Sequence, residues 1–275
     1  MTHLRISVTQ QCNLNCFYCH REGEKESDKE MSLEKIIEIA KAMSKIGIEY
    51  VKITGGEPLL RKDIVQIVYH LASLETFKDI SITTNGLLLR AFAEPLKKAG
   101  LTRVNIGCDS LSSSITKKNI MNVLPGIMAA KEAGLDPIKL NMVILKGINH
   151  HEVEEMIKLT GKHNLILQLI ELIPNNNFDY EKYYFPLKII EQELKKKTDK
   201  IQVRELQGRK QYRISGGIVE IVSPSHKIFC ETCSKIRVTS DGRIKPCFMR
   251  EDNTVVFKNQ KSIIEAIKNR GLYNG

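Results

Sequence analysis

The stretch LRISVTQQCNLNCFYC at residues 4–19 joins a strand pattern to a run of cysteines. Apolar and polar side chains alternate over residues 4–9, as in a half-buried β-strand. Cys12, Cys16 and Cys19 follow at once, in the loop after that strand. Short strand patterns followed by helical patterns then recur along the chain. This alternation predicts repeated βα units and a parallel sheet.

Six βα units are expected, followed by a segment of different character. Ser32 should cap the first helix, and Asn149 with Glu152 resembles a capping box that opens the fifth. Right-handed connections would curl the units into an incomplete barrel with functional loops at the carboxyl ends of its strands. The strands are expected at residues 4–9, 50–54, 80–84, 103–108, 138–145 and 165–171.

The character of the sequence changes after the polar break PNNN at residues 174–177. One more helix is expected at 186–197, and the rest is β-rich apart from a final helix at 262–268. Short strand patterns at 211–214 and 217–222 and a turn at 240–242 suggest a small sheet that carries the last three cysteines. The predicted fold class is α/β: a (β/α)6 TIM-like partial barrel at residues 1–198 and a small C-terminal α+β domain at 199–275.

Composition narrows the class of protein. The chain has 275 residues, of which 42% are hydrophobic and 27% charged, so it can bury a globular core. We expect a cytoplasmic protein, because no secretory signal or membrane-length apolar run is found. The formal charge of +10 favours anionic partners. The lysines at 195–197 end a predicted helix, where they are best explained as a solvated face.

The first cysteine set has the spacing C-x3-C-x2-C. Three thiolates are one fewer than a four-iron cluster usually takes, which leaves one iron open to a ligand such as S-adenosylmethionine. Zinc is the alternative, with His20 as its fourth ligand. The segment at residues 54–58, TGGEP, favours the first interpretation, because Gly55 and Gly56 let the backbone approach a cofactor closely.

A second set of three cysteines lies near the C-terminus. Cys230, Cys233 and Cys247 have the spacing C-x2-C-x13-C. A zinc ribbon completed by His226 is the alternative to a second iron-sulfur cluster with an open iron, and the first set favours the cluster. Cys108, at the end of a predicted strand, is expected to be a small buried apolar residue.

The cysteine run, with Phe17-Tyr18 between its last two members, resembles the radical S-adenosylmethionine superfamily. More specifically, the sequence resembles the GTP 3′,8-cyclase family, which begins molybdenum cofactor biosynthesis. The segments that carry this resemblance are residues 4–9, 54–58, 83–86, 109–111, 146–149, 170–171 and 229–242.

The resemblance implies two [4Fe-4S] clusters, S-adenosylmethionine and a defined reaction. The first cluster would cleave the cofactor to a 5′-deoxyadenosyl radical, which removes a hydrogen from C3′ of GTP. The sugar radical would then attack C8 of guanine, giving (8S)-3′,8-cyclo-7,8-dihydroguanosine 5′-triphosphate. The partners implied are GTP, a reduced electron donor and the downstream cyclic pyranopterin monophosphate synthase, and the family allows a homodimer.

The resemblance also assigns residues to these groups. Cys12, Cys16 and Cys19 would hold the first cluster, and Cys230, Cys233 and Cys247 the second. Contacts to S-adenosylmethionine would come from Tyr18, Gly56, Gly107 and Ile173. Contacts to GTP would come from Arg5, Lys52, Thr83, Lys139, Lys235, Ile236 and Arg237, the last of these also catalytic.

The chain departs from the family pattern at several places. Gln10-Gln11 stands where Asp-Arg is common, Gly107 where serine is common, and Gln168 and Lys235 where arginine is frequent; the sequence ends at Asn274-Gly275 where many members have Gly-Gly. A two-cluster radical enzyme acting on another nucleotide or on a peptide therefore remains an alternative. A zinc-containing nucleic-acid-binding protein is disfavoured, because the aromatic content is only 6% and tryptophan is lacking. We expect neither nucleic acid nor a membrane as a partner.

Overall fold

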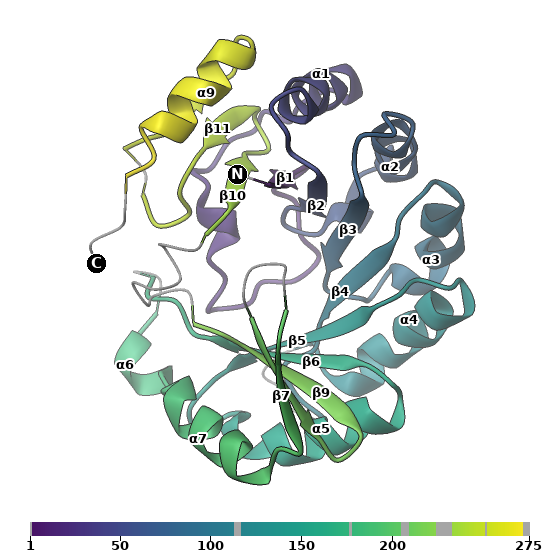
Figure 1. The fold of residues 1–275 in the computed structure, drawn as a ribbon, viewed down its shortest axis with the longest axis vertical. Coiled ribbons are helices and arrows are strands. Elements are labelled where there is room, and N and C mark those ends of the chain that lie inside the picture. Colours follow the sequence, from purple (N-terminus) through teal and green to yellow (C-terminus); the bar gives the residue numbers. More distant parts are fainter. Residues whose placement is uncertain are drawn as a thin grey trace.

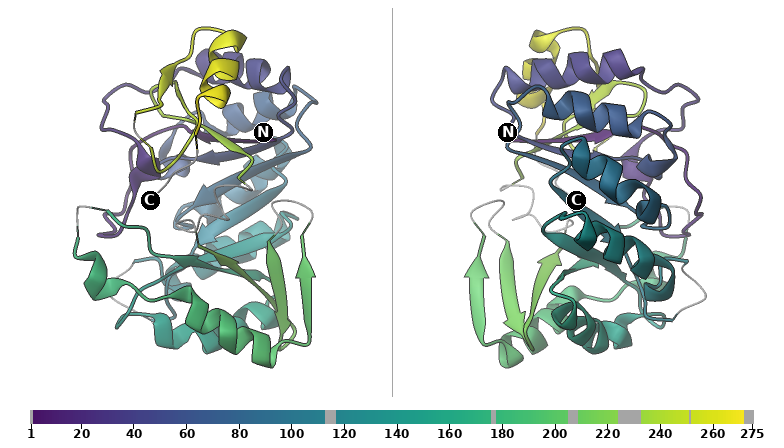
Figure 2. Two further views of the ribbon diagram at one scale, coloured as in Figure 1. Left: turned by 60° about the vertical axis from the view of Figure 1, so that its left-hand side comes forward. Right: turned by 90° about the vertical axis from the view of Figure 1, so that its right-hand side faces the viewer.

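The computed structural model describes residues 2–112, 117–175, 178–204, 209–223, 233–250 and 252–271. Their strands form a twelve-stranded sheet in the order β12-β11-β10-β1-β2-β3-β4-β5-β6-β9-β8-β7. The sheet curves into an arc with helices along its outside (Figures 1 and 2). The first and last strands of this order do not pair with each other, so the barrel is incomplete, as the sequence predicts.

The six predicted strands are confirmed, each within two residues at either end. They run parallel and lie side by side in chain order. The strands are β1 His3–Ser7, β2 Tyr50–Thr54, β3 Asp79–Thr84, β4 Arg103–Gly107, β5 Ile138–Ile144 and β6 Ile166–Glu171. The helices are α1 Leu33–Ser44, α2 Ile64–Ala72, α3 Leu89–Lys98, α4 Ile120–Glu132, α5 Val153–Lys162, α6 Tyr180–Tyr183, α7 Leu187–Lys197 and α9 Gln260–Lys268.

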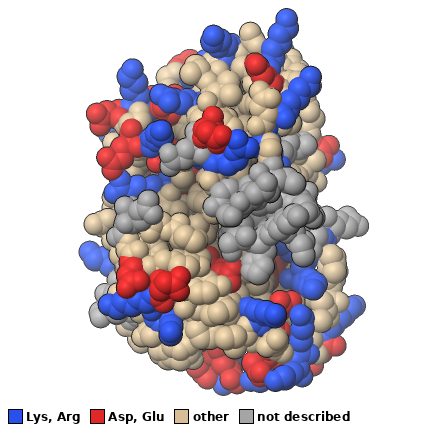
Figure 3. Space-filling model, turned by 90° about the vertical axis from the view of Figure 1, so that its left-hand side faces the viewer, with Lys and Arg blue, Asp and Glu red and all other residues tan. Residues whose placement is uncertain are grey.

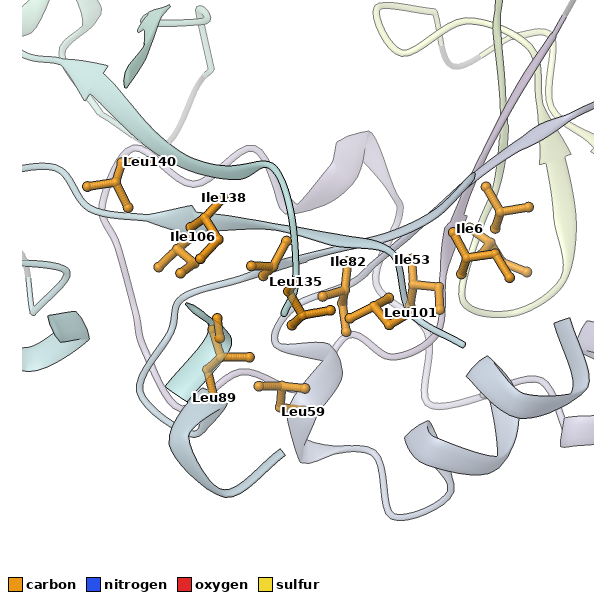
Figure 4. Packing of buried hydrophobic residues seen from close by; sticks show 14 of the residues in the cluster. Ile6, Ile53, Leu59, Ile82, Leu89, Leu101, Ile106, Leu135, Ile138 and Leu140 are labelled. Atoms are coloured by element: carbon orange, nitrogen blue, oxygen red, sulfur yellow. The ribbon is translucent and has the colours of Figure 1, made fainter. Parts of the chain in front are cut away.

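Alternation along each strand separates an apolar outer face from a polar inner face. Ile6, Ile53, Ile82 and Ile106 are fully buried in one core with residues of the surrounding helices, such as Leu89 (Figure 4). Successive side chains of a strand point to opposite faces, so the residues between these isoleucines face the inside of the barrel. The burial of the outer face stabilises the fold and leaves the inner face for polar groups.

The expected separate C-terminal sheet is wrong. β9 Gly217–Val222 pairs with β6 and continues into β8 Lys210–Ile214 and β7 Lys200–Val203, whereas β10 Lys235–Val238 pairs with β1 at the opposite edge. β11 Arg243–Lys245 and β12 Val255–Val256 extend that second edge. An open barrel leaves two rows of unpaired backbone groups, and these strands satisfy them. The domain boundary between residues 198 and 199 stays a prediction.

The two predicted helix caps have different outcomes. Ser32 caps α1, because its side chain accepts a hydrogen bond of 3.3 Å from the backbone N–H of Lys35. The capping box at Asn149 is wrong. The Asn149 side chain instead accepts from the N–H of Leu145 at 2.7 Å and donates to the carbonyl of Asp109 at 2.6 Å. Asn149 is fully buried, and its side-chain amide bonds the segments that follow β4 and β5 to each other. It does not cap the 3-10 turn η3 His150–Glu152.

Charges of both signs mix on the surface. The lysines at 195–197 pair with Glu191, Glu193 and Glu154, which confirms a solvated face at the end of α7. Figure 3 shows Lys and Arg interspersed with Asp and Glu on one side of the molecule, with no continuous basic stripe there. Among the described helices, none combines the length and the apolar character needed to cross a bilayer.

Candidate active site

The inner face of the barrel surrounds a cavity of about 330 Å³. Polar or charged residues from β1 to β6 line it, together with five cysteines: Cys12, Cys16, Cys19, Cys233 and Cys247. A cavity of this size can hold a small organic ligand. The two cysteine sets, about 220 residues apart in the sequence, therefore share one site.

The first cysteine set follows the carboxyl end of β1. The sulfurs of Cys12 and Cys19 accept backbone N–H groups of Leu14 and Arg21, each at 3.4 Å. Burial raises the pKa of the Cys12 and Cys16 thiols, and a bound cationic centre would favour their thiolates. The N–H groups directed at the sulfurs of Cys12 and Cys19 suit the thiolates of an iron-sulfur cluster.

No three His, Cys, Asp or Glu side chains among the described residues are grouped so that they could hold one metal ion. A single zinc needs ligands that converge on one point. A four-iron cluster binds each thiolate through a different iron, so its ligands can be more widely spaced. The described residues of the first cysteine set therefore do not form a site for a single zinc ion.

The glycine turn after β2 packs directly on the cysteine loop. The N–H of Gly56 donates to the carbonyl of Thr9 at 2.8 Å. A Cβ atom on Gly56 would lie 2.3 Å from the carbonyl oxygen of Gln11 and 2.5 Å from that of Gln10. Gly55 and Gly56 also line the cavity. The close approach that requires glycine here is thus between two loops, in addition to any approach to a cofactor.

Glu57 fixes the same turn to the next strand. Its buried carboxylate accepts from the backbone N–H of Asn85 at 2.6 Å and from the hydroxyl of Thr84 at 2.6 Å. Although burial raises the pKa of Glu57, these donors favour its ionised form. The loops after β1, β2 and β3 are therefore held as one unit around the cysteines.

The second cysteine set lies at the opposite end of the barrel. β10 runs parallel to β1, and its first residue, Lys235, lies opposite His3 at the start of β1. Cys233 therefore lies just before the amino end of β10. Cys247 follows β11, which is antiparallel to β10 and returns to that end. Cys230 and the alternative zinc ligand His226 lie outside the described residues.

Charges around Cys233 favour its thiolate. Burial by itself would raise the pKa of Cys233, but a backbone hydrogen bond involving Lys235 and the cations Arg270, Lys235 and Arg237 lower it. Arg270 also donates to the carbonyl of Cys233 at 2.6 Å. A stabilised thiolate is the form that binds iron, so the described part of this set also fits a cluster.

A row of cations crosses the barrel between the two sets. Arg237 on β10 lies beside Arg5 on β1, and Arg5 beside Lys52 on β2. Arg5 pairs with Glu22 through two bonds of 2.6 and 2.7 Å, and Lys52 contacts the Asn105 side-chain oxygen at 3.0 Å. The three cations of this row, Arg237, Arg5 and Lys52, together carry more charge than the carboxylate of Glu22.

This excess of positive charge affects the pKa of the buried groups. Burial and then Arg103, Arg5, Lys139 and Lys235 lower the pKa of Lys52 well below its usual value, and Lys235 is affected in the same way. Burial and Arg5 lower the pKa of Arg237 to about 10, and its buried Nε has no hydrogen-bond partner among the described residues. Such a site favours an anionic ligand.

The other residues predicted to contact S-adenosylmethionine or GTP differ in whether their side chains line the cavity. Thr83, Gly107 and Ile173 line the cavity, as do Lys139, Lys235 and the residues of the row. The side chain of Ile236 is instead buried in the core, on the opposite face of β10, so a contact to nucleotide would have to use its backbone. Tyr18 is buried with Leu145 and Leu172, and its hydroxyl donates to Asp109.

Several charged cavity residues were missed at the sequence level. Strand alternation could have found Arg103, which shares the inner face of β4 with Asn105 and Gly107. It could also have found Glu220 on β9, a buried residue that lies beside the cavity rather than lining it. No local pattern marks the others, which include Glu22, Lys118, Arg204, Arg209 and Arg270.

The comparisons with known proteins agree with this geometry. The model of the radical SAM superfamily matches residues 6–160, and that of the molybdenum cofactor synthesis C family matches residues 165–268. A probable GTP 3′,8-cyclase of Archaeoglobus fulgidus is 41% identical over 99% of this chain and 96% of its own length. One from Methanothermobacter marburgensis is 44% identical, with the same coverage of both chains. The chain belongs to the GTP 3′,8-cyclase family.

This member of the GTP 3′,8-cyclase family is also similar to solved structures of other proteins. The crystal structure of SuiB from Streptococcus suis superposes with a TM-score of 0.71 at 17% identity. The match covers 99% of this chain and 67% of SuiB. At this identity the likeness shows the fold alone. It agrees with the partial barrel of this cyclase-family chain and its flanking strands.

Proposed function

We propose that the protein is a GTP 3′,8-cyclase. The observation that carries the proposal is the placement of the two cysteine sets at opposite ends of one cavity, with buried cations between them. A radical generated at one end and a purine held at the other would meet in the middle. The sequence relatives support the choice of GTP.

The two clusters and S-adenosylmethionine, when bound, supply an electron and a 5′-deoxyadenosyl radical. Cys12, Cys16 and Cys19 would hold the first cluster, and Gly56, Gly107 and Ile173, which line the cavity, would contact the cofactor. Cys233 and Cys247, with Cys230, would hold the second. Arg5, Lys52, Lys235 and Arg237 bind and orient the nucleotide, and Arg237 lies beside the second set. Orientation of the reacting atoms is the protein's main contribution.

The competing substrate is a peptide in the same cavity. A peptide does not need a buried row of arginine and lysine side chains, whereas a triphosphate does. The cation excess between the cysteine sets therefore favours a phosphorylated substrate.

The test is anaerobic incubation of the cluster-loaded protein with GTP, S-adenosylmethionine and a reductant, followed by mass spectrometry. We expect 5′-deoxyadenosine and a cyclised isomer of GTP. Formation of 5′-deoxyadenosine without a product derived from GTP would retain the radical chemistry and exclude this substrate.

The remaining partners are part of the same proposal. A reduced electron donor must supply the electrons, and the product requires a synthase that converts it to a cyclic pyranopterin. A homodimer and a cytoplasmic location stay predictions from the sequence.

A further inference from the structure

Glu220 lies at the centre of a group of cations beside the cavity. Its side chain is fully buried, and one oxygen lies 2.6 Å from Nζ of Lys139. Arg204 approaches the other oxygen at 3.3 Å, and Arg209 lies 3.8 Å from the carboxylate. These residues come from β5, β9 and the two ends of the connection between β7 and β8. We name them the Glu220 cluster.

The charges of the Glu220 cluster do not balance. Three cations share one carboxylate, and the strand neighbours of Glu220 in register, Gln168 and Gln211, are neutral. Burial and the two arginines lower the pKa of Lys139 to about 8, although Glu220 opposes this shift. Positive charge in a buried place is costly unless an anion compensates it. The Glu220 cluster can therefore accept further negative charge.

An anion in the cavity can reach the cluster. Lys139, Arg204 and Arg209 all line the cavity, and the side chains of Arg204 and Arg209 keep 25% and 15% of their surface exposed. Two guanidinium groups beside one ammonium offer many donors in a small space. Guanidinium groups match the oxygens of phosphate through paired hydrogen bonds, so a polyphosphate suits this group better than a single carboxylate does.

We infer that Arg204 and Arg209 bind the terminal phosphates of a nucleoside triphosphate, and that Glu220 is a positioning residue. In the ligand-free protein Glu220 holds Lys139, Arg204 and Arg209 together. The choice of guanine as the base rests on the proposed function. The assignment of phosphates to Arg204 and Arg209 does not depend on which base the nucleotide carries.

The first test measures equilibrium binding of GTP and of guanosine to the anaerobic, cluster-loaded protein. Arg204→Gln and Arg209→Gln should each weaken GTP binding by about tenfold or more, because a charge-assisted hydrogen bond is lost. Guanosine binding should change less than about twofold, since it has no phosphate to lose a bond. The matched control is Arg213→Gln, on the exposed side of β8, which should leave both affinities unchanged. Unchanged GTP affinity in both variants, or equal losses for guanosine, would overturn the inference.

Inorganic tripolyphosphate separates this inference from the proposed function. If wild type cyclises no GTP but binds tripolyphosphate in a manner that depends on Arg209, the phosphate site stands and the GTP assignment falls. If wild type cyclises GTP and the Arg204 and Arg209 variants bind tripolyphosphate as tightly as wild type, the phosphate site falls alone.

The second test addresses the role of Glu220. Glu220→Gln leaves three cations without their carboxylate, so its melting temperature should fall without ligand. Tripolyphosphate should then raise that melting temperature by more than it does in wild type, because the ligand replaces the lost negative charge. An equal or smaller increase would contradict the positioning role of Glu220, and no increase in either protein would show that the three cations do not bind phosphate.

Discussion

Single residues of the same type have different surroundings in this molecule. Cys16 is half-buried in the cavity wall, and its pKa is raised by burial while Lys118 opposes that shift. Cys108 is fully buried in the core outside the wall, and burial raises its pKa to about 12. Chemistry is therefore expected from Cys16 and packing from Cys108.

Replacing each of these two thiols tests that distinction. Cys16→Ala should abolish 5′-deoxyadenosine formation and most of the visible absorbance of the first cluster, because one of three protein ligands is lost. Cys108→Ala is the matched control and should keep both, with a loss of stability of roughly 1 kcal/mol for the small cavity it leaves. Full 5′-deoxyadenosine formation by the Cys16 variant would contradict the ligand assignment.

His3 should make stability depend on pH. Burial and then Lys235, Arg103, Lys52 and Arg209 lower its pKa from 6.5 to about 4. The unfolded chain thus binds a proton at a higher pH than the folded chain does. The stability from neutral His3 is complete above pH 6.5 and is lost as the pH falls toward about 4.

The measurement is the melting temperature of the cluster-loaded protein at pH 7.5 and at pH 5.5, in a common salt concentration. His3→Gln should narrow the difference between the two temperatures. His70→Gln, on the half-exposed side of α2, is the control and should leave the difference as in wild type. An unchanged difference in the His3 variant would contradict the prediction.

Among elements, the loops after β1 and β2 contact each other directly, and the loop after β1 carries Cys12, Cys16 and Cys19. The backbone carbonyls of Gln10 and Gln11 occupy the space where any side chain on Gly56 would begin. At Gly107 an added Cβ would lie 3.0 Å from Cδ of Lys118, the middle of a flexible side chain. The two glycines should therefore respond differently to the same substitution.

Gly56→Ala should lower iron content and melting temperature, because two backbone segments must separate by about an ångström and overpacking of this kind costs about 1–3 kcal/mol. Gly107→Ala should retain the iron, since Lys118 can move. Both effects are measured by iron analysis and thermal unfolding of anaerobically purified protein. Equal iron content in the two variants would refute the role given to the loop contact.

For the whole molecule, the pairing of β10 with β1 joins the two ends of the chain. The segment that follows α9 contributes to this closure, because Arg270 donates to the carbonyl of Cys233 and the carbonyl of Arg270 accepts from the Asn253 side chain at 3.1 Å. The C-terminal segment thus fixes the backbone at Cys233.

Arg270→Ala should destabilise the second cluster selectively. Iron content should fall toward that of one cluster, while S-adenosylmethionine cleavage by the first cluster persists. Lys268→Ala removes one positive charge from the exposed face of α9 and should retain the iron. Loss of both clusters in the Arg270 variant would indicate general unfolding instead.

The sequence by itself determined the features that depend on neighbours in the chain. Alternation over residues 50–54 and 138–145 predicted two strands because side-chain period is a local property. The spacing of Cys12, Cys16 and Cys19 predicted a three-ligand site because all three lie in one loop.

Only the tertiary structure decided which distant segments meet. Glu220 is 81 positions from Lys139, yet its strand completes the edge of the barrel and brings the carboxylate to the lysine. Cys233 is at the opposite end from Cys12 because β10 runs parallel to β1. Pairing across such separations depends on which sheet edges remain open, and no local pattern records this. The two-ended cavity is a property of the curved, open sheet as a whole rather than of any one motif.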